Sequence, residues 1–158
     1  MNSKRKDRLR RWIRVLMVFI AALLLVMALV IPVINNFIAA GVADDLEALP
    51  LPADTTLVDS VSLAGKSVGS GNGMQYFGAV LLHSDLSLAE LQSHYMPYQK
   101  GLFDCRVAAQ SGAEVTQITH GSLAFDATVE GDGWYILYSW GSAPAWARDW
   151  LNLDMRGN

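Results

Sequence analysis

The sequence predicts an α+β fold, in which an N-terminal transmembrane helix precedes a small antiparallel sheet with one or two helices packed on it. Two observations carry this prediction. Val15–Ile34 is a run of twenty residues without a charge, and about twenty helical residues span a bilayer core of about 30 Å. Residues 55–158 then alternate between short apolar segments with strand spacing and turn-forming residues.

Charge is distributed unevenly along the 158 residues, whose net charge is −3. Seven basic residues and one acidic residue precede Val15, so residues 1–14 carry +6. Five basic and fourteen acidic residues follow, so the rest of the chain carries −9. Because basic flanks stay in the cytoplasm, we expect a single-pass cell-membrane protein with a cytoplasmic N-terminus and an outer C-terminal domain. An acidic domain also argues against nucleic-acid binding.

Residues 35–54 predict a helical stalk and linker between the membrane and the outer domain. Apolar residues recur there at helical spacing up to Leu49, and Pro50 ends the helix. A cleaved signal peptide is the alternative, because small residues precede Asp44 and would allow release of a secreted protein after Ala43. Signal peptides have apolar regions of about 7–15 residues, however, and this run is longer.

The outer domain, residues 55–158, is expected to follow the order β-β-α-β-β-β-β-α. A capping box of Ser87 and Glu90 marks the start of its first helix. Met74–His83 is apolar on both faces, which predicts a central strand. The expected strands cover residues 55–64, 74–83, 103–110, 114–119, 122–129 and 134–141, and the helices cover 84–96 and a short segment from Pro144 that carries Trp146 and Trp150.

Candidate catalytic chemistry is sparse in this sequence. Cys105 is the single cysteine, so no intrachain disulfide forms, and its alternation with Val107 predicts a small core residue. We therefore assign no catalytic residue, no metal and no cofactor. The alternative is an extracytoplasmic metal-assisted hydrolase using Glu90, His94 and His120. Glu90 and His94 are four residues apart and would share a helix face, but a zinc site needs three or four ligands.

Four short motifs resemble those of a group of small, uncharacterised bacterial proteins with one membrane anchor and an outer domain. They are Gly71-Asn72-Gly73-Met74-Gln75-Tyr76-Phe77-Gly78, Ser84-Asp85-Leu86-Ser87, Tyr138-Ser139-Trp140-Gly141 and Asp154-Met155-Arg156-Gly157. No activity is established for that group, so the resemblance implies no reaction. It implies a shared surface near the glycine-rich loop and the C-terminal Arg156-Gly157.

These observations together predict a binding or accessory module for an envelope partner, either a protein or a peptide component. Aromatic residues are dense near the C-terminus, and exposed tryptophans are frequent in binding surfaces. The expected partner surface joins the glycine-rich loop to the last helix. Its residues are Gly71, Asn72, Gly73, Trp146, Trp150 and Arg156.

Overall fold

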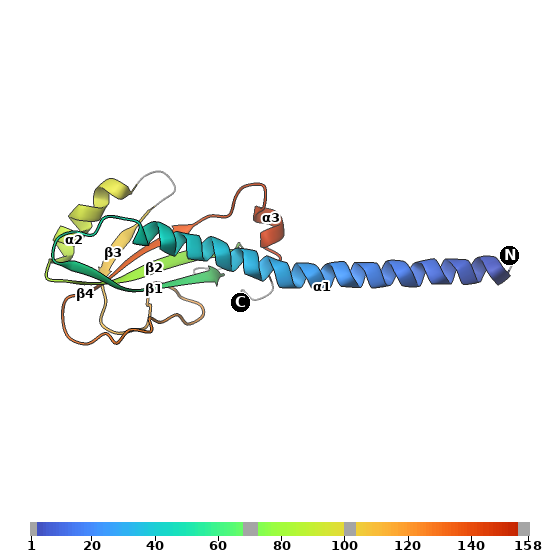
Figure 1. The fold of residues 1–158 in the computed structure, drawn as a ribbon, viewed down its shortest axis with the longest axis horizontal. Coiled ribbons are helices and arrows are strands. Elements are labelled where there is room, and N and C mark those ends of the chain that lie inside the picture. The colour runs from blue at the N-terminus through green and yellow to red at the C-terminus, as the bar shows by residue number, and fades with distance from the viewer. Residues whose placement is uncertain (1–2, 68–72, 100–103, 155–158) are drawn as a thin grey trace.

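The computed structural model describes residues 3–67, 73–99 and 104–154, and it confirms the predicted α+β class (Figure 1). A long N-terminal helix is followed by a sheet of four strands and by short helices. The elements are α1 (Ser3–Glu47), β1 (Thr55–Gly65), β2 (Gln75–Ser84), α2 (Leu88–Tyr95), the 3₁₀ helix η1 (Met96–Tyr98), β3 (Arg106–Ala109), β4 (Trp134–Gly141) and α3 (Arg148–Leu151).

The sheet is antiparallel, with the strand order β1-β2-β4-β3. Its centre is the β2–β4 pair, in which Val80 lies opposite Leu137. The apolar side chains of β2 are buried on both faces of the sheet, which confirms the predicted central strand. One layer of helices and one layer of irregular chain provide the cover for these two faces.

The second half of α1 lies across one face of the sheet (Figure 1). Its buried residues recur every three or four positions, so they form one stripe directed at the sheet. The stripe consists of Ile31, Asn35, Ala39, Val42, Ala43 and Leu46. The helix predicted for residues 35–49 is therefore present, but it does not stand free as a stalk, because it forms part of the core of the domain.

Two glycines allow this close contact between α1 and the sheet. A Cβ atom added to Gly78 would lie 2.5 Å from the backbone nitrogen of Ala43, which is far inside van der Waals contact. A Cβ atom on Gly141 would overlap the side chain of Val42. Both strand positions therefore have to stay without a side chain for the helix backbone to reach the sheet.

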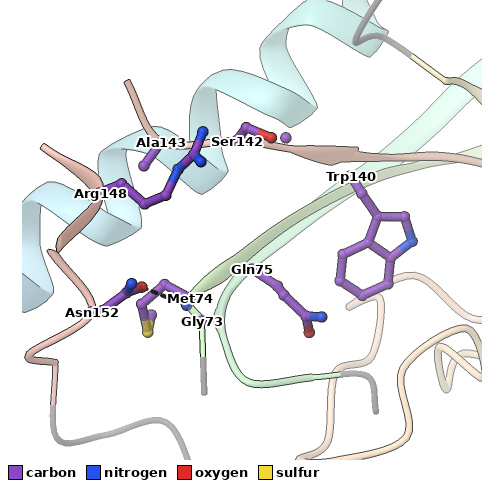
Figure 2. Close-up of a pocket in the computed structure, with 9 residues that line it drawn as sticks. Gly73, Met74, Gln75, Trp140, Ser142, Ala143, Arg148 and Asn152 are labelled. Atoms are coloured by element: carbon purple, nitrogen blue, oxygen red, sulfur yellow. Dashed lines mark hydrogen bonds between the residues drawn. The ribbon is translucent and has the colours of Figure 1, made fainter. Parts of the chain in front are cut away.

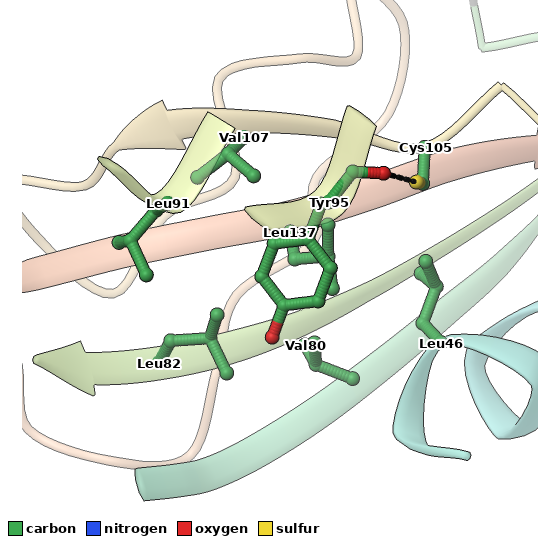
Figure 3. Close-up of a cluster of buried hydrophobic side chains, with 8 residues drawn as sticks. All are labelled: Leu46, Val80, Leu82, Leu91, Tyr95, Cys105, Val107 and Leu137. Carbon is green, nitrogen blue, oxygen red and sulfur yellow. Dashed lines mark hydrogen bonds between the residues drawn. The ribbon is translucent and has the colours of Figure 1, made fainter. Parts of the chain in front are cut away.

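Helix α2 covers the same face as α1, at the end of the sheet near Leu46 (Figure 3). The predicted capping box is present: the Ser87 backbone N–H donates to the Glu90 carboxylate at 2.8 Å, and the Glu90 backbone N–H donates to the Ser87 hydroxyl. Residues from α1, α2 and three strands fill this cluster, which consists of Leu46, Val80, Leu82, Leu91, Tyr95, Cys105, Val107 and Leu137.

Residues 110–133 cover the other face, and here the prediction of two strands over 114–119 and 122–129 was wrong. The described chain forms a single isolated β-bridge there, between Glu114 and Ala124. Its buried apolar residues pack on Phe77, Ala79, Leu81 and Ile136 of the sheet. The inward residues are Val115, Ile118, Phe125 and Val129.

Hydrogen bonds outside any strand ladder explain why this segment needs no sheet. The carboxylate of Asp59, at a bulge in β1, accepts the backbone N–H groups of Asp126 and Ala127 at 2.7 and 3.1 Å. The Ser67 carbonyl accepts the backbone N–H groups of Thr119 and His120. Because these backbone N–H groups already have hydrogen-bond acceptors, the segment can remain irregular while its apolar side chains stay buried.

The first half of α1 has no cover from the domain. Residues 8–26 are exposed on all sides although most of them are apolar. This helix is long and apolar enough to cross a membrane, a test that signal sequences also pass. Figure 1 shows it projecting beyond one end of the sheet.

Candidate binding surface

One end of the sheet gathers the segments in which the sequence predicts a binding surface. β2 begins and β4 ends there, since Tyr76 lies opposite Gly141, and α3 lies beside α1 at the same end (Figure 1). We call it the α3 end. The Met74 backbone N–H donates to the Asn152 side-chain oxygen at 2.8 Å. This bond joins the end of the glycine-rich connection to the C-terminal segment.

A buried polar network holds the α3 end onto α1. The Tyr76 hydroxyl donates to the Asn35 side-chain oxygen at 2.8 Å. The Asn35 amide nitrogen donates to the Asp154 carboxylate at 2.9 Å and to the Leu151 carbonyl at 3.2 Å. Asn35 is fully buried, so these bonds replace the water that its amide loses. Burial, and then the charge of Asp154, raise the pKa of Tyr76.

A pocket of about 270 Å³ opens at the α3 end between the start of β2 and α3 (Figure 2). Its described lining offers a guanidinium, amides, a hydroxyl and an indole, with no carboxylate or imidazole among them. The lining residues are Gly73, Met74, Gln75, Trp140, Gly141, Ser142, Ala143, Arg148 and Asn152. Such a set can bind a polar ligand, but it holds no side chain suited to general acid–base catalysis near neutral pH.

A second pocket of about 420 Å³ shares Gln75 and Trp140 with the first. Arg106, Gln117 and Tyr138 complete its lining. Within the described part of the chain, the buried side-chain oxygen of Gln117 accepts no hydrogen bond. We call the two adjoining pockets the β2–β4 groove. Arg148 lines the first pocket, and Arg106, which forms a salt bridge with Asp104 at 2.6 Å, lines the second.

The two predicted tryptophans lie together at the α3 end. Trp150 belongs to α3 and is partly buried against α1, whereas Trp146 precedes α3 and is 79% exposed. Their ring centroids are 6.2 Å apart. The other C-terminal aromatics have core contacts instead: Trp140 packs edge-on against Phe77.

The structure brings some of the predicted surface residues to the same end of the molecule. Gly73 lines the first pocket, and Trp146 and Trp150 lie on the neighbouring α3 segment. Gly71, Asn72 and Arg156 lie outside the described residues. Sequence reasoning missed Arg148 and Asn152, because isolated polar residues after a strand carry no spacing signal. It also missed Asn35, whose position directly after a long apolar run was the available signal.

The residues of the metal-hydrolase alternative do not form a metal site. No group of three histidine, cysteine, aspartate or glutamate side chains within residues 3–67, 73–99 and 104–154 could hold a metal ion. The Glu90 carboxylate is bound to Ser87, and the His94 ring lies 2.9 Å from the Pro50 carbonyl oxygen. The backbone of His120 is bound to Ser67 instead.

Cys105 is a core residue, as its alternation with Val107 predicts. It is fully buried, and its thiol points at the Tyr95 carbonyl oxygen 3.8 Å away (Figure 3). Burial raises the pKa of the Cys105 thiol, which lowers the fraction of reactive thiolate. This environment is that of an inert structural cysteine.

Comparison with known proteins found no matching family model, no matching curated protein and no matching solved structure. The resemblance carried by the motifs around Gly73 and Trp140 therefore stays a prediction. The function has to be argued from the surface itself.

Proposed function

We propose that this is a single-pass membrane protein whose outer domain is a binding or accessory module for an envelope partner. The observation that carries the proposal is the contrast along α1: residues 8–26 are apolar and exposed, whereas the residues that follow are built into the domain. An exposed apolar helix of this length is stable in a bilayer and not in water. The basic N-terminal segment favours a cytoplasmic N-terminus.

The packing of α1 supports retention of the anchor over cleavage after Ala43. Cleavage there would remove Ile31, Ala39, Val42 and Ala43 from the core, together with Asn35 and its three hydrogen bonds. The released chain would expose the face of β2 on which Tyr76 and Gly78 lie. A signal peptide is discarded after export, so its residues do not normally form the core of the mature domain.

The β2–β4 groove supports a binding role. It combines several amides, the partly exposed Trp140, Arg148, and Arg106, whose guanidinium is paired with Asp104, and this composition is suited to polar ligands. We therefore propose a protein or peptide component of the envelope that carries acidic or amide groups as the partner.

Site-specific photo-crosslinking in cells tests the binding role. A crosslinking residue replaces Ser142 in the groove, and in a matched control it replaces Asp132, which is exposed at the opposite end of the sheet. We expect discrete crosslinked products from position 142 and none of the same mass from position 132. Identical products from both positions would contradict a partner site in the groove.

Cysteine labelling tests the orientation. In a Cys105→Ala background, Asp132→Cys and Ser3→Cys are each treated with a membrane-impermeant maleimide on intact cells. We expect rapid labelling at position 132 and labelling at position 3 after lysis alone. Labelling of position 3 on intact cells, with position 132 protected, would reverse the proposed topology.

A further inference from the structure

We propose that residues 146–153, which include α3, form a second membrane contact, with Trp146, Trp150 and Leu153 in the outer interfacial layer of the bilayer that α1 crosses. This inference rests on the proposed membrane anchoring by α1. It adds that the domain lies on the lipid surface in one fixed orientation, and that the occupant of this aromatic surface is lipid.

The depth of α3 is set by its contacts with α1. Ile31 is buried in one cluster with Ala147 and Leu151, and Met27 and Ile34 pack against the same cluster. These α1 residues belong to the last two turns of the predicted span. The segment that touches them therefore lies at the level where the span leaves the hydrocarbon core, which is the depth that tryptophan prefers.

Large apolar side chains are exposed at this level on both elements. Trp146 is 79% exposed and Leu153 is 58% exposed, and Phe37 on α1 is 74% exposed three residues beyond Ile34. Phe37 lies about 4.5 Å further along the helix axis than Ile34 at 1.5 Å per residue. Exposed aromatic residues at the depth of a bilayer surface gain apolar contact there while their polar edges stay hydrated.

The C-terminal segment is held in place and does not depend on lipid for its position. Asn35 donates to the Leu151 carbonyl and to Asp154, and Asn152 accepts the backbone N–H of Met74. These bonds fix the segment on α1 and on β2. Trp146 therefore keeps a constant height relative to the span, so two contacts with the bilayer constrain the tilt of the domain.

The charges of the segment indicate which kind of lipid surface it fits. Its exposed charged residues are Arg148 and Asp149, which have opposite signs. A contact without net charge gains little from anionic headgroups, because electrostatic attachment needs clusters of basic residues. The contact should therefore form on zwitterionic phosphatidylcholine as well as on anionic bilayers.

Depth-dependent fluorescence quenching tests this contact in the full chain reconstituted into phosphatidylcholine vesicles. In a Cys105→Ala background, an environment-sensitive dye is attached at Trp146→Cys, at Leu24→Cys in the middle of the span, or at Asp132→Cys at the far end of the domain. Nitroxide lipids carry the quencher either near the headgroup or at the acyl-chain centre. The exposure of Trp146 makes this substitution compatible with folding, and Leu153→Cys provides a second position.

We expect headgroup-level nitroxides to quench the dye at position 146 at least twofold, with the same result at position 153 and no quenching at position 132. Deep nitroxides should quench the dye at position 24. Quenching at position 24 without quenching at 146 and 153 would overturn the second contact and leave the anchor intact. Absence of quenching at position 24 would overturn the anchor itself, and the present inference with it.

Discussion

The two halves of α1 are one continuous apolar helix, yet they have opposite surroundings. Residues 8–26 are all exposed, whereas from Ile31 to Leu46 one stripe of the helix is buried against the sheet and α3. The difference shows that hydrophobicity alone does not define an anchor. The first half exposes its apolar side chains, whereas the second half covers a protein core.

Asn35 lies one turn inside the buried part of α1. It is the first polar residue after Val15–Ile34, and its buried amide connects α1 to Tyr76 and Asp154. An amide in this position is costly in lipid and stable once it is hydrogen-bonded to the domain. The exposed first half of α1 and the domain are therefore joined by continuous helix, without a flexible linker.

Deletion of the first half of α1 should leave the domain folded, whereas deletion that extends through most of the second half should unfold it. This is the largest effect we expect. A chain that begins at Met27 keeps the buried stripe and should show a cooperative thermal transition in mild detergent. A chain that begins at Asp44 loses most of the stripe and should show none. Circular dichroism during heating measures both. Equal cooperativity in the two truncated chains would contradict a core built on α1.

Gly78→Leu should destabilise the fold by about 3 kcal/mol, because overpacking a tight contact costs about 1–3 kcal/mol and here the obstacle is helix backbone. The matched control is Gly112→Ala. Gly112 has open space around it, so this change should stay within about 0.5 kcal/mol. Urea unfolding in detergent measures the free energy of unfolding of both variants. Equal values would show that α1 does not pack closely on β2.

Asn35→Leu should cost about 2 kcal/mol, since unpaired buried polar groups cost about 1–3 kcal/mol each and part of the loss is relieved by local water. Tyr76→Phe removes one of the three bonds and should cost about 1 kcal/mol. The double variant should lose less than the sum of the two, because Tyr76 and Asn35 share a bond. Strict additivity in urea unfolding would contradict the network.

The loss of stability at alkaline pH should be the smallest of these effects. Burial raises the pKa of Tyr95, which packs beside Leu46, to about 12. Because the folded pKa is raised above the unfolded value of about 10, the stabilisation is complete below pH 10 and is lost as the pH rises toward 12. The melting temperature of Tyr95→Phe should therefore fall less between pH 9 and about 11 than that of the unmodified protein. If the melting temperatures of the two proteins fell equally with pH, burial of the Tyr95 hydroxyl would be contradicted.

The sequence predicted the elements whose signals are local. The capping box of Ser87, the uncharged run from Val15 and the doubly apolar strand β2 each depend on neighbouring residues, and each lies where it was expected. The alternation over residues 122–129 matches the burial of Phe125 and Val129, but Val115 and Ile118 are three positions apart and no strand ladder forms. That absence depends on acceptors distant in sequence, such as the Asp59 carboxylate.

The packing of α1 and most of the groove could not be predicted from local patterns. Apolar residues after Ile34 fit a stalk as well as a core helix, and the distinction depends on Gly78, which is distant in sequence and meets α1 only in the folded chain. The groove likewise combines Gln75 with Arg148, which the fold brings together. Gly73 and the two tryptophans were proposed from the sequence because glycine and aromatic clusters stand out in any sequence, and their binding role stays a prediction.

The N-terminus and intact mass of the protein recovered from cell fractions test the central claim most directly. We expect the protein in the membrane fraction with residues 1–43 retained and a mass of at least 17.3 kDa. A folded protein in the soluble exported fraction, beginning at Asp44, would contradict an account in which α1 is both the anchor and part of the core.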